Sequence, residues 1–86
     1  MTIQVTNNAQ QEVEVAINEW GTGGDTSFFT LHQGKSEKWD RVDERGFVMA
    51  VKHRGAQRPY YVQHQSNINI YDHRVTDHDS IIRTID

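Results

Sequence analysis

Apolar and polar residues alternate with a period of two in a series of short segments along this chain, and Gly, Asn, Asp or Pro residues close most of them. Side chains two residues apart lie on the same face of a strand, so the alternation predicts strands with one buried face and one solvated face. No segment sustains the period of an amphipathic helix. The chain is therefore predicted to be an all-β domain of about eight short strands. The clearest alternating positions are Ile3, Val5, Val13, Val15, Ile17, Phe29, Leu31, Phe47, Met49, Val51, Ile68 and Ile70.

Tight turns between the segments predict antiparallel pairing, because a parallel pair needs a long crossover connection. A compact antiparallel β-sandwich is the favoured architecture, and a small closed β-barrel is the alternative, since it also buries alternating positions. The 86 residues are expected to form a single domain, residues 1–86, with a small core for one chain. Exposed strands on so small a domain would be covered by a partner, which predicts a homo-oligomer.

Individual segments carry further structural expectations. The segments Thr2–Thr6 and about Glu12–Trp20 are expected to form an opening hairpin. The strongly polar segment Ser36–Arg41 is expected at a sheet edge or on a solvated face, and the most apolar segment, Gly46–His53, at a central position. The segment Arg58–Gln63, which contains Pro59, is expected to begin at an edge or beside a bulge, because proline lacks a backbone donor.

The composition excludes several classes of protein. The chain contains no cysteine, so disulfides, cysteine-ligated zinc and thiol catalysis are excluded. No segment resembles a signal peptide, and the longest apolar run, Phe47–Val51, is too short to cross a bilayer. These features favour a cytoplasmic location.

The charge balance argues against a nucleic-acid partner. Nine Lys and Arg residues are scattered among twelve Asp and Glu residues, and the formal net charge is −3. This distribution offers no basic stripe that would neutralise a phosphate backbone. Only a spatial convergence of arginines would change that expectation, and the candidates are Arg41, Arg45, Arg54 and Arg58.

No motif in the sequence indicates catalysis or a cofactor. A Gly-x-Ser-x-Gly elbow and a His-Glu-x-x-His pair are absent, and Gly21–Gly24 lacks the strand-to-helix context of a nucleotide loop. The His- and Asp-rich stretch Asp72–Asp79 lacks the spacing of zinc sites and the glycine and glutamate of a calcium loop. We therefore expect a protein that is not an enzyme and has no catalytic residue, metal or cofactor, and we interpret Asp72–Asp79 as a solvated turn.

Two tryptophans and a glycine-rich segment suggest a ligand site. Trp20 comes directly before Gly21–Asp25, and Trp39 lies in the polar strand after the next turn. Sugar rings stack their C–H faces on aromatic rings, and their hydroxyls need charged or amide groups such as Asp25 and Arg41 close by. The alternative is that both tryptophans fill the ends of a small core.

The adjacent pair Tyr60 and Tyr61 must point to opposite sides of its strand, so one ring should be buried and the other exposed. The exposed ring would suit a ligand wall or a subunit interface, because tyrosine is enriched in both. A cross-strand pair that only supports the sheet is the alternative.

Aromatic and glycine residues recur through the first two thirds of the chain, at Ile17-Asn18-Glu19-Trp20-Gly21, Phe28-Phe29, Gly34, Trp39 and Gly46-Phe47-Val48-Met49. With these residues the sequence resembles small, cysteine-poor β-sandwich proteins of fungi. One such group is the cytoplasmic fungal defence lectins, and this resemblance implies glycan binding by a multivalent oligomer. A more distant resemblance is to the aegerolysin-like proteins, which are longer and recognise membrane sphingolipids.

Taken with the resemblance, the residues predict a carbohydrate-binding, lectin-type module that recognises glycans or glycoconjugates. Nucleic acid is not an expected partner, and membrane contact is expected only through glycans or lipids. The alternatives are a protein or membrane-lipid interaction module that uses the same exposed aromatics, and an assembly subunit with no small ligand. The predicted carbohydrate-binding residues are Trp20, Asp25, Trp39, Arg41, Tyr60 and Tyr61.

Overall fold

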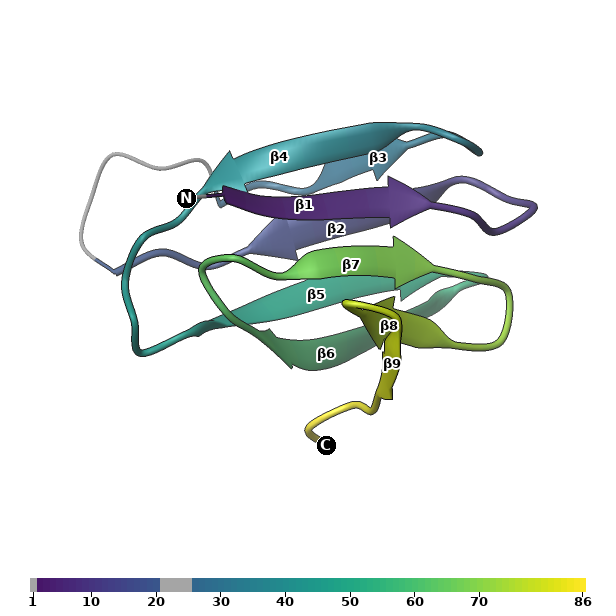
Figure 1. The fold of residues 1–86 in the computed structure, drawn as a ribbon. Coiled ribbons are helices and arrows are strands. Elements are labelled where there is room, and N and C mark those ends of the chain that lie inside the picture. The colour runs from purple at the N-terminus through teal and green to yellow at the C-terminus, as the bar shows by residue number, and fades with distance from the viewer. Residues whose placement is uncertain (1, 21–25) are drawn as a thin grey trace.

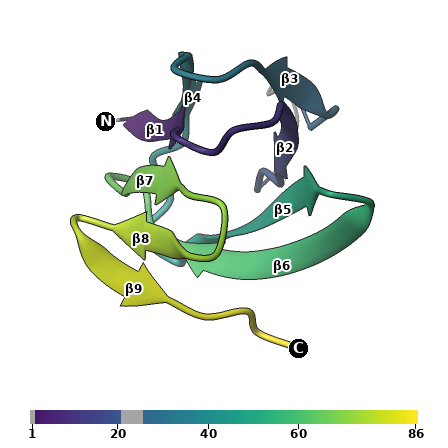
Figure 2. The same cartoon turned by 90° about the vertical axis from the view of Figure 1, so that its right-hand side faces the viewer.

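The computed structural model describes residues 2–20 and 26–86, which form two β-sheets packed face to face (Figures 1 and 2). One sheet has five strands in the order β4-β1-β7-β8-β9, and the other has four in the order β3-β2-β5-β6. The strands are β1 (Thr2–Asn7), β2 (Val13–Ile17), β3 (Phe29–Leu31), β4 (Ser36–Asp40), β5 (Phe47–His53), β6 (Ala56–Val62), β7 (Asn67–Ile70), β8 (Val75–Asp77) and β9 (Ser80–Ile82).

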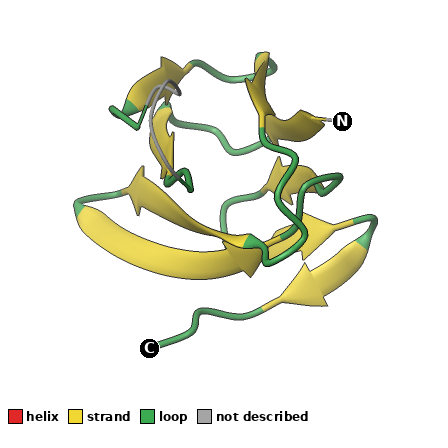
Figure 3. Ribbon diagram, turned by 90° about the vertical axis from the view of Figure 1, so that its left-hand side faces the viewer, coloured by secondary structure: helices red, strands yellow, loops and turns green. Residues whose placement is uncertain are grey.

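The predicted all-β sandwich is confirmed. The strands are divided between two sheets and do not close into one, and the described part of the chain consists of strands and loops (Figure 3). Within those residues there is no helix long and apolar enough to cross a membrane.

The expected opening hairpin is wrong, because β1 and β2 belong to different sheets. β1 pairs antiparallel with β4 and parallel with β7, so the prediction of purely antiparallel pairing is also wrong. A parallel pair needs a long connection. Here the whole four-stranded sheet, together with β4, lies between β1 and β7 in the chain and supplies that connection.

The core lies between the sheets and follows the alternation in the sequence. Inward positions of both sheets meet there, and most of them are fully buried. Burial of such apolar side chains is the main favourable term in the folding free energy. The core residues are Ile3, Val5, Val13, Val15, Ile17, Leu31, Trp39, Phe47, Met49, Val51, Tyr60, Val62, Ile68, Ile70 and Val75.

Strand positions within the sheets agree with the sequence. β5 is central in its sheet, β4 is an edge strand, and β6 with Pro59 is an edge strand. β5 and β6 are joined by the two residues Arg54 and Gly55, and both have positive φ, as type I′ hairpin turns require. This turn fixes the register in which Val48 lies opposite Tyr61 and Ala50 lies opposite Pro59.

Asn7 is a polar residue buried where the chain leaves β1 and crosses to the other sheet. It is fully buried, yet its side chain is well bonded. Its Nδ2 donates to the carbonyls of Gln11 and Leu31, both at 2.9 Å, and its Oδ1 accepts from the backbone N–H of Ala9 at 2.8 Å. The Asn7 side chain therefore ties the crossover to strand β3 of the opposite sheet.

Replacing Asn7 with Ala should destabilise the fold strongly. Each buried polar partner left without a hydrogen bond costs about 1–3 kcal/mol, so we expect a loss of at least about 2 kcal/mol in the free energy of unfolding, measured by chemical denaturation. The matched control is Asn8→Ala, because Asn8 is exposed and its side chain donates a single solvent-exposed hydrogen bond to Asn69. An equal loss in the two variants would contradict the role given to Asn7.

Candidate functional site

The structure places two of the predicted site residues in the core. Trp39 is 6% exposed and meets Phe29 edge to face, with ring centroids 6.3 Å apart. Tyr60 is 8% exposed, and burial raises the pKa of its hydroxyl. Neither ring shares a surface with Trp20, so the six residues predicted from the sequence do not come together as one site.

Arg41 is buried as well, and it binds backbone rather than facing solvent. Its Nε donates to the carbonyl of Asn18 at 2.9 Å, and its Nη2 donates to the carbonyl of Ile17 at 3.0 Å. A third donor, Nη1, reaches the carbonyl of Asp40 at 3.0 Å. Arg41 therefore joins the end of β4 to the end of β2 in the opposite sheet, and it positions the chain just before Trp20.

Trp20 and Tyr61 do come together, and they meet at Arg45. Trp20 is 46% exposed and Tyr61 is 47% exposed. The Trp20 Nε1–H donates to the Gly46 carbonyl at 2.8 Å, and the Tyr61 hydroxyl donates to the Arg45 carbonyl at 3.0 Å. The Arg45 guanidinium lies 3.7 Å from the centroid of the Trp20 ring. We call Trp20, Arg45 and Tyr61 the aromatic corner.

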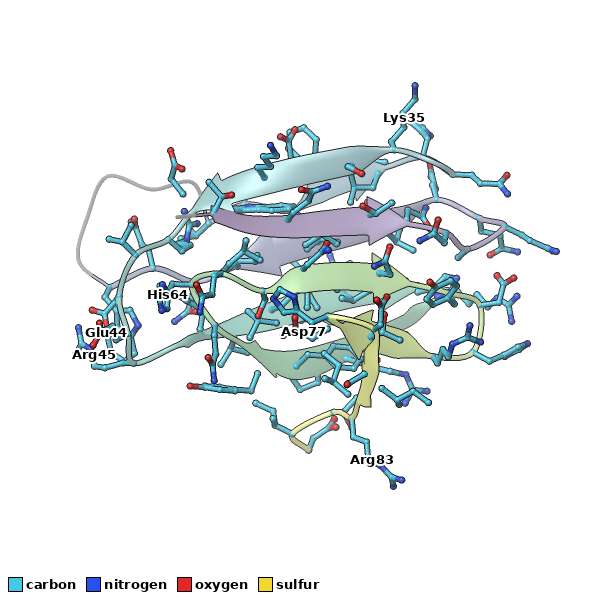
Figure 4. The ribbon with its side chains drawn as sticks, viewed as in Figure 1. Lys35, Glu44, Arg45, His64, Asp77 and Arg83 are labelled. Carbon is cyan, nitrogen blue, oxygen red and sulfur yellow. The ribbon has the colours of Figure 1, made fainter. Side chains whose placement is uncertain are left out.

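The aromatic corner lies at one end of the sandwich, where Trp20 after β2 and Tyr61 in β6 meet Arg45 on the connection between β4 and β5. Figure 3 faces that end, and Figure 4 labels Arg45 there beside Glu44. Asp25, the acidic residue predicted for the site, lies outside the described residues.

Asp43 holds the guanidinium of Arg45 in place. The carboxylate accepts from Arg45 Nε at 3.0 Å and from Nη2 at 2.7 Å, and it also accepts from the Arg45 backbone N–H at 2.8 Å. The hydrogen bonds from Arg45 lower the pKa of Asp43 to about 2. Asp43 is therefore ionised over the whole physiological pH range, and it remains paired with Arg45, whose guanidinium stacks on Trp20.

Gly46 makes the close approach of Tyr61 possible. Its φ of +87° favours glycine, and a Cβ at this position would collide with the hydroxyl end of the Tyr61 ring. Any other residue would push the ring away from the turn.

Next to the aromatic corner, the outward side of the four-stranded sheet is also apolar. Val48 lies opposite Tyr61 and is 39% exposed. Ala16, Ala50 and Pro59 form a row of small side chains across β2, β5 and β6. Ala16 is buried and Ala50 and Pro59 are half-buried, so the exposed apolar surface on this side consists mainly of Val48 and Tyr61.

A second concave region lies at the other end of the sandwich, and no motif in the sequence predicted it. It is a cleft of about 430 Å³ between the β5–β6 hairpin and the β7–β8 connection, two segments that lie at the end facing the viewer in Figure 2. Of the four arginines that the sequence allowed to converge, Arg54 and Arg58 both line this cleft. Arg41 and Arg45 lie at the opposite end of the sandwich. The lining residues of the cleft are Val51, His53, Arg54, Ala56, Arg58, Tyr60, Ile70, Tyr71, Asp72, His73, Arg74 and Val75.

His53 is the unusual group in the cleft wall. Its Nε2 is buried and has no hydrogen-bond partner among the described residues. Burial lowers the pKa of His53, the charge of Arg54 adds to that shift, and Asp72 opposes it. No group of three or more His, Asp or Glu residues suited to a metal ion occurs in residues 2–20 and 26–86.

The two tryptophans should differ sharply in their effect on stability. Trp39→Ala empties a core position and should lower the free energy of unfolding by about 3–5 kcal/mol, whereas Trp20→Ala removes an exposed ring and should cost about 1 kcal/mol or less. Chemical denaturation of the two variants measures both values. A cost for Trp20→Ala as large as that for Trp39→Ala would show that the aromatic corner is core rather than surface.

The stability of the protein should depend on pH through His53. Because its folded-state pKa is lowered, the unfolded chain takes up a proton on this imidazole at a higher pH than the folded protein does. The associated stability is present above about pH 6.5 and is lost as the pH falls below that value. The charged or titratable groups that line the cleft with His53 are Arg54, Arg58, Tyr60, Tyr71, Asp72, His73 and Arg74.

We expect the loss of unfolding free energy between pH 7.5 and pH 5.5 to be smaller in His53→Gln than in the parent protein. Denaturation curves at the two pH values measure this difference. Equal losses in the two proteins would contradict the assignment to His53.

The aromatic corner and the cleft differ in chemistry. The corner offers open rings with polar groups at their edges, and the cleft offers arginines around a concave volume that is partly open to solvent. Comparison with known proteins adds nothing to either: no family model matches the chain, and neither the curated proteins nor the solved structures contain a match.

Proposed function

We propose that this protein is a carbohydrate-binding module, without enzymatic activity, that holds a glycan against the aromatic corner. The observation that supports it most is the state of the two rings. Trp20 and Tyr61 each keep nearly half of their surface exposed, although the polar atom of each is bonded to the backbone beside β5. The rings are thus fixed in position and open to a ligand.

The chemistry of a sugar suits such a surface. Its C–H faces stack on aromatic rings, and its hydroxyls need hydrogen-bond partners at the ring edges. Arg45 supplies donors, because side-chain bonds to Asp43 use two of the five N–H groups of its guanidinium. The Asp43 carboxylate is an acceptor at the same place. Fixing these groups before binding reduces the entropic cost of ordering them.

We further propose a cytoplasmic homo-oligomer, comparable to the fungal defence lectins that the sequence resembles. A shallow site binds a single sugar weakly, and several sites on one assembly raise the overall avidity without new contacts. The edge strands β3 and β4 offer unpaired backbone for such an assembly.

Removing either open ring should weaken glycan binding. Loss of one stacked ring costs about 1–3 kcal/mol, so Trp20→Ala and Tyr61→Ala should each reduce affinity roughly ten-fold to a hundred-fold. A glycan array, followed by calorimetry on the best glycan, measures this change. The matched control is Ile81→Ala on β9 of the other sheet, where the side chain is 67% exposed, and it should bind as the parent does.

The same experiment separates the alternatives. Glycan binding that is unchanged in folded Trp20→Ala and Tyr61→Ala variants would exclude the aromatic corner as the site. Binding to sphingolipid vesicles but to no glycan would indicate the lipid-interaction module. Neither glycan nor vesicle binding, with an oligomeric mass that falls in both variants, would indicate an assembly subunit.

A further inference from the structure

The inner face of the β5–β6 hairpin breaks the apolar pattern of the core at one end. In β5 the inward positions continue from Val51 to His53, and in β6 Arg58 lies directly opposite Val51 in the register. The Arg58 side chain is exposed even though its position in the register belongs to the core-facing side, so its charge remains in contact with solvent at the cleft. Where a sequence departs from the pattern required by its own fold, a functional reason is expected.

Three arginines converge on the cleft from three different segments. Arg54 comes from the hairpin turn, Arg58 from β6 and Arg74 from the β7–β8 connection. Arg54 is paired with Asp72 at 3.3 Å, and Asp72 is held by the backbone N–H of Gln10 at 3.0 Å.

The remaining charge of the cleft is positive. Neither Arg58 nor Arg74 has a carboxylate within ion-pair distance in the part of the chain that the structure describes. With both imidazoles neutral, three arginines against one aspartate leave a formal charge of +2 in the cleft, in a chain whose net charge is −3. An isolated positive region on an acidic protein attracts a small anion and disfavours a long polyanion.

The shape of the cleft also suits a small molecule. About 430 Å³ lies within the usual range of roughly 300–1,000 Å³ for ligand pockets. Its walls are apolar at Ile70 and Val75, and the Arg74 guanidinium lies 4.2 Å from the centroid of the Tyr71 ring. The buried, unpartnered Nε2 of His53 adds an unsatisfied polar atom to the same wall.

We propose that this cleft binds a small molecule carrying a phosphate or sulfate ester, with Arg58 and Arg74 as the principal anion-binding residues. Guanidinium groups donate paired N–H bonds that match the oxygens of these anions. A phosphate monoester, with a charge of about −2 near neutral pH, would balance the charge of the cleft, and a sulfate ester, with a single negative charge, would offset half of it. This inference goes beyond the proposed glycan site and is independent of it. The aromatic corner and the cleft lie at opposite ends of β5, whose seven residues separate them by about 20 Å.

The test is a nuclear magnetic resonance titration of the full chain with inorganic sulfate and inorganic phosphate, at constant ionic strength adjusted with chloride. We expect saturable shift changes confined to the β5–β6 hairpin and the β7–β8 connection. Arg58→Gln and Arg74→Gln should each weaken the binding at least ten-fold. Arg83→Gln is the matched control, because Arg83 follows β9 and does not line the cleft.

Either of two results in this titration would overturn the proposal. One is the absence of saturation, with shifts spread over Arg83 and the other surface cations. The other is unchanged affinity in Arg74→Gln, which removes an exposed side chain outside the strands and should remain folded even if Arg58→Gln does not. A parallel titration with phenyl phosphate and phenyl sulfate identifies which ester class the cleft prefers. Tighter binding of one ester supports the proposal and assigns that class. If neither ester binds more tightly than chloride, the proposal is wrong.

Discussion

The arrangement of the end that carries the aromatic corner depends on one buried arginine. Arg41 directly follows β4 of the five-stranded sheet. Its guanidinium donates to two carbonyls at the end of β2 in the four-stranded sheet. Strand pairing is confined to each sheet, so contacts across the core rely on side chains and crossing segments. Apolar packing supplies most of that adhesion, but it has no direction. The hydrogen bonds of Arg41 fix the position of β4 relative to β2. The turn that carries Arg45 follows shortly after Arg41 in the chain, so its position depends on the same hydrogen bonds.

The alternation in the sequence was sufficient to predict the fold class, because burial on one face is a local property of each strand. It placed β5 at the centre and β6 at an edge, and it predicted that one of Tyr60 and Tyr61 would be exposed. Pairing between distant strands is not a local property. Nothing near Thr2–Asn7 indicates that its parallel partner begins at Asn67, more than fifty residues later.

The candidate site was less predictable for a related reason. Trp39 lies among Lys38, Asp40 and Arg41, and this polar context favoured an exposed ring. The register overrides the context, because Trp39 lies opposite fully buried Ile3 and points the same way. The arginines of the cleft show the opposite problem, since Arg58 and Arg74 lie sixteen positions apart in the chain and meet only when two sheets are packed. The useful local signal was the charge of Arg58 at a position where alternation requires an apolar side chain.

The last residues of the chain connect the two sheets on the side opposite β3 and β4. After β9 the chain leaves the five-stranded sheet, Thr84 forms a bridge with Tyr60, and the N–H of Ile85 donates to the Pro59 carbonyl at 3.1 Å. The tail therefore acts as a short substitute strand on the free edge of β6 (Figure 1). An unprotected edge is a template for β-aggregation. Removing these few residues would leave every core residue in place. It would, however, expose the backbone of β6 at Pro59 and Tyr60, where another chain could then pair with it.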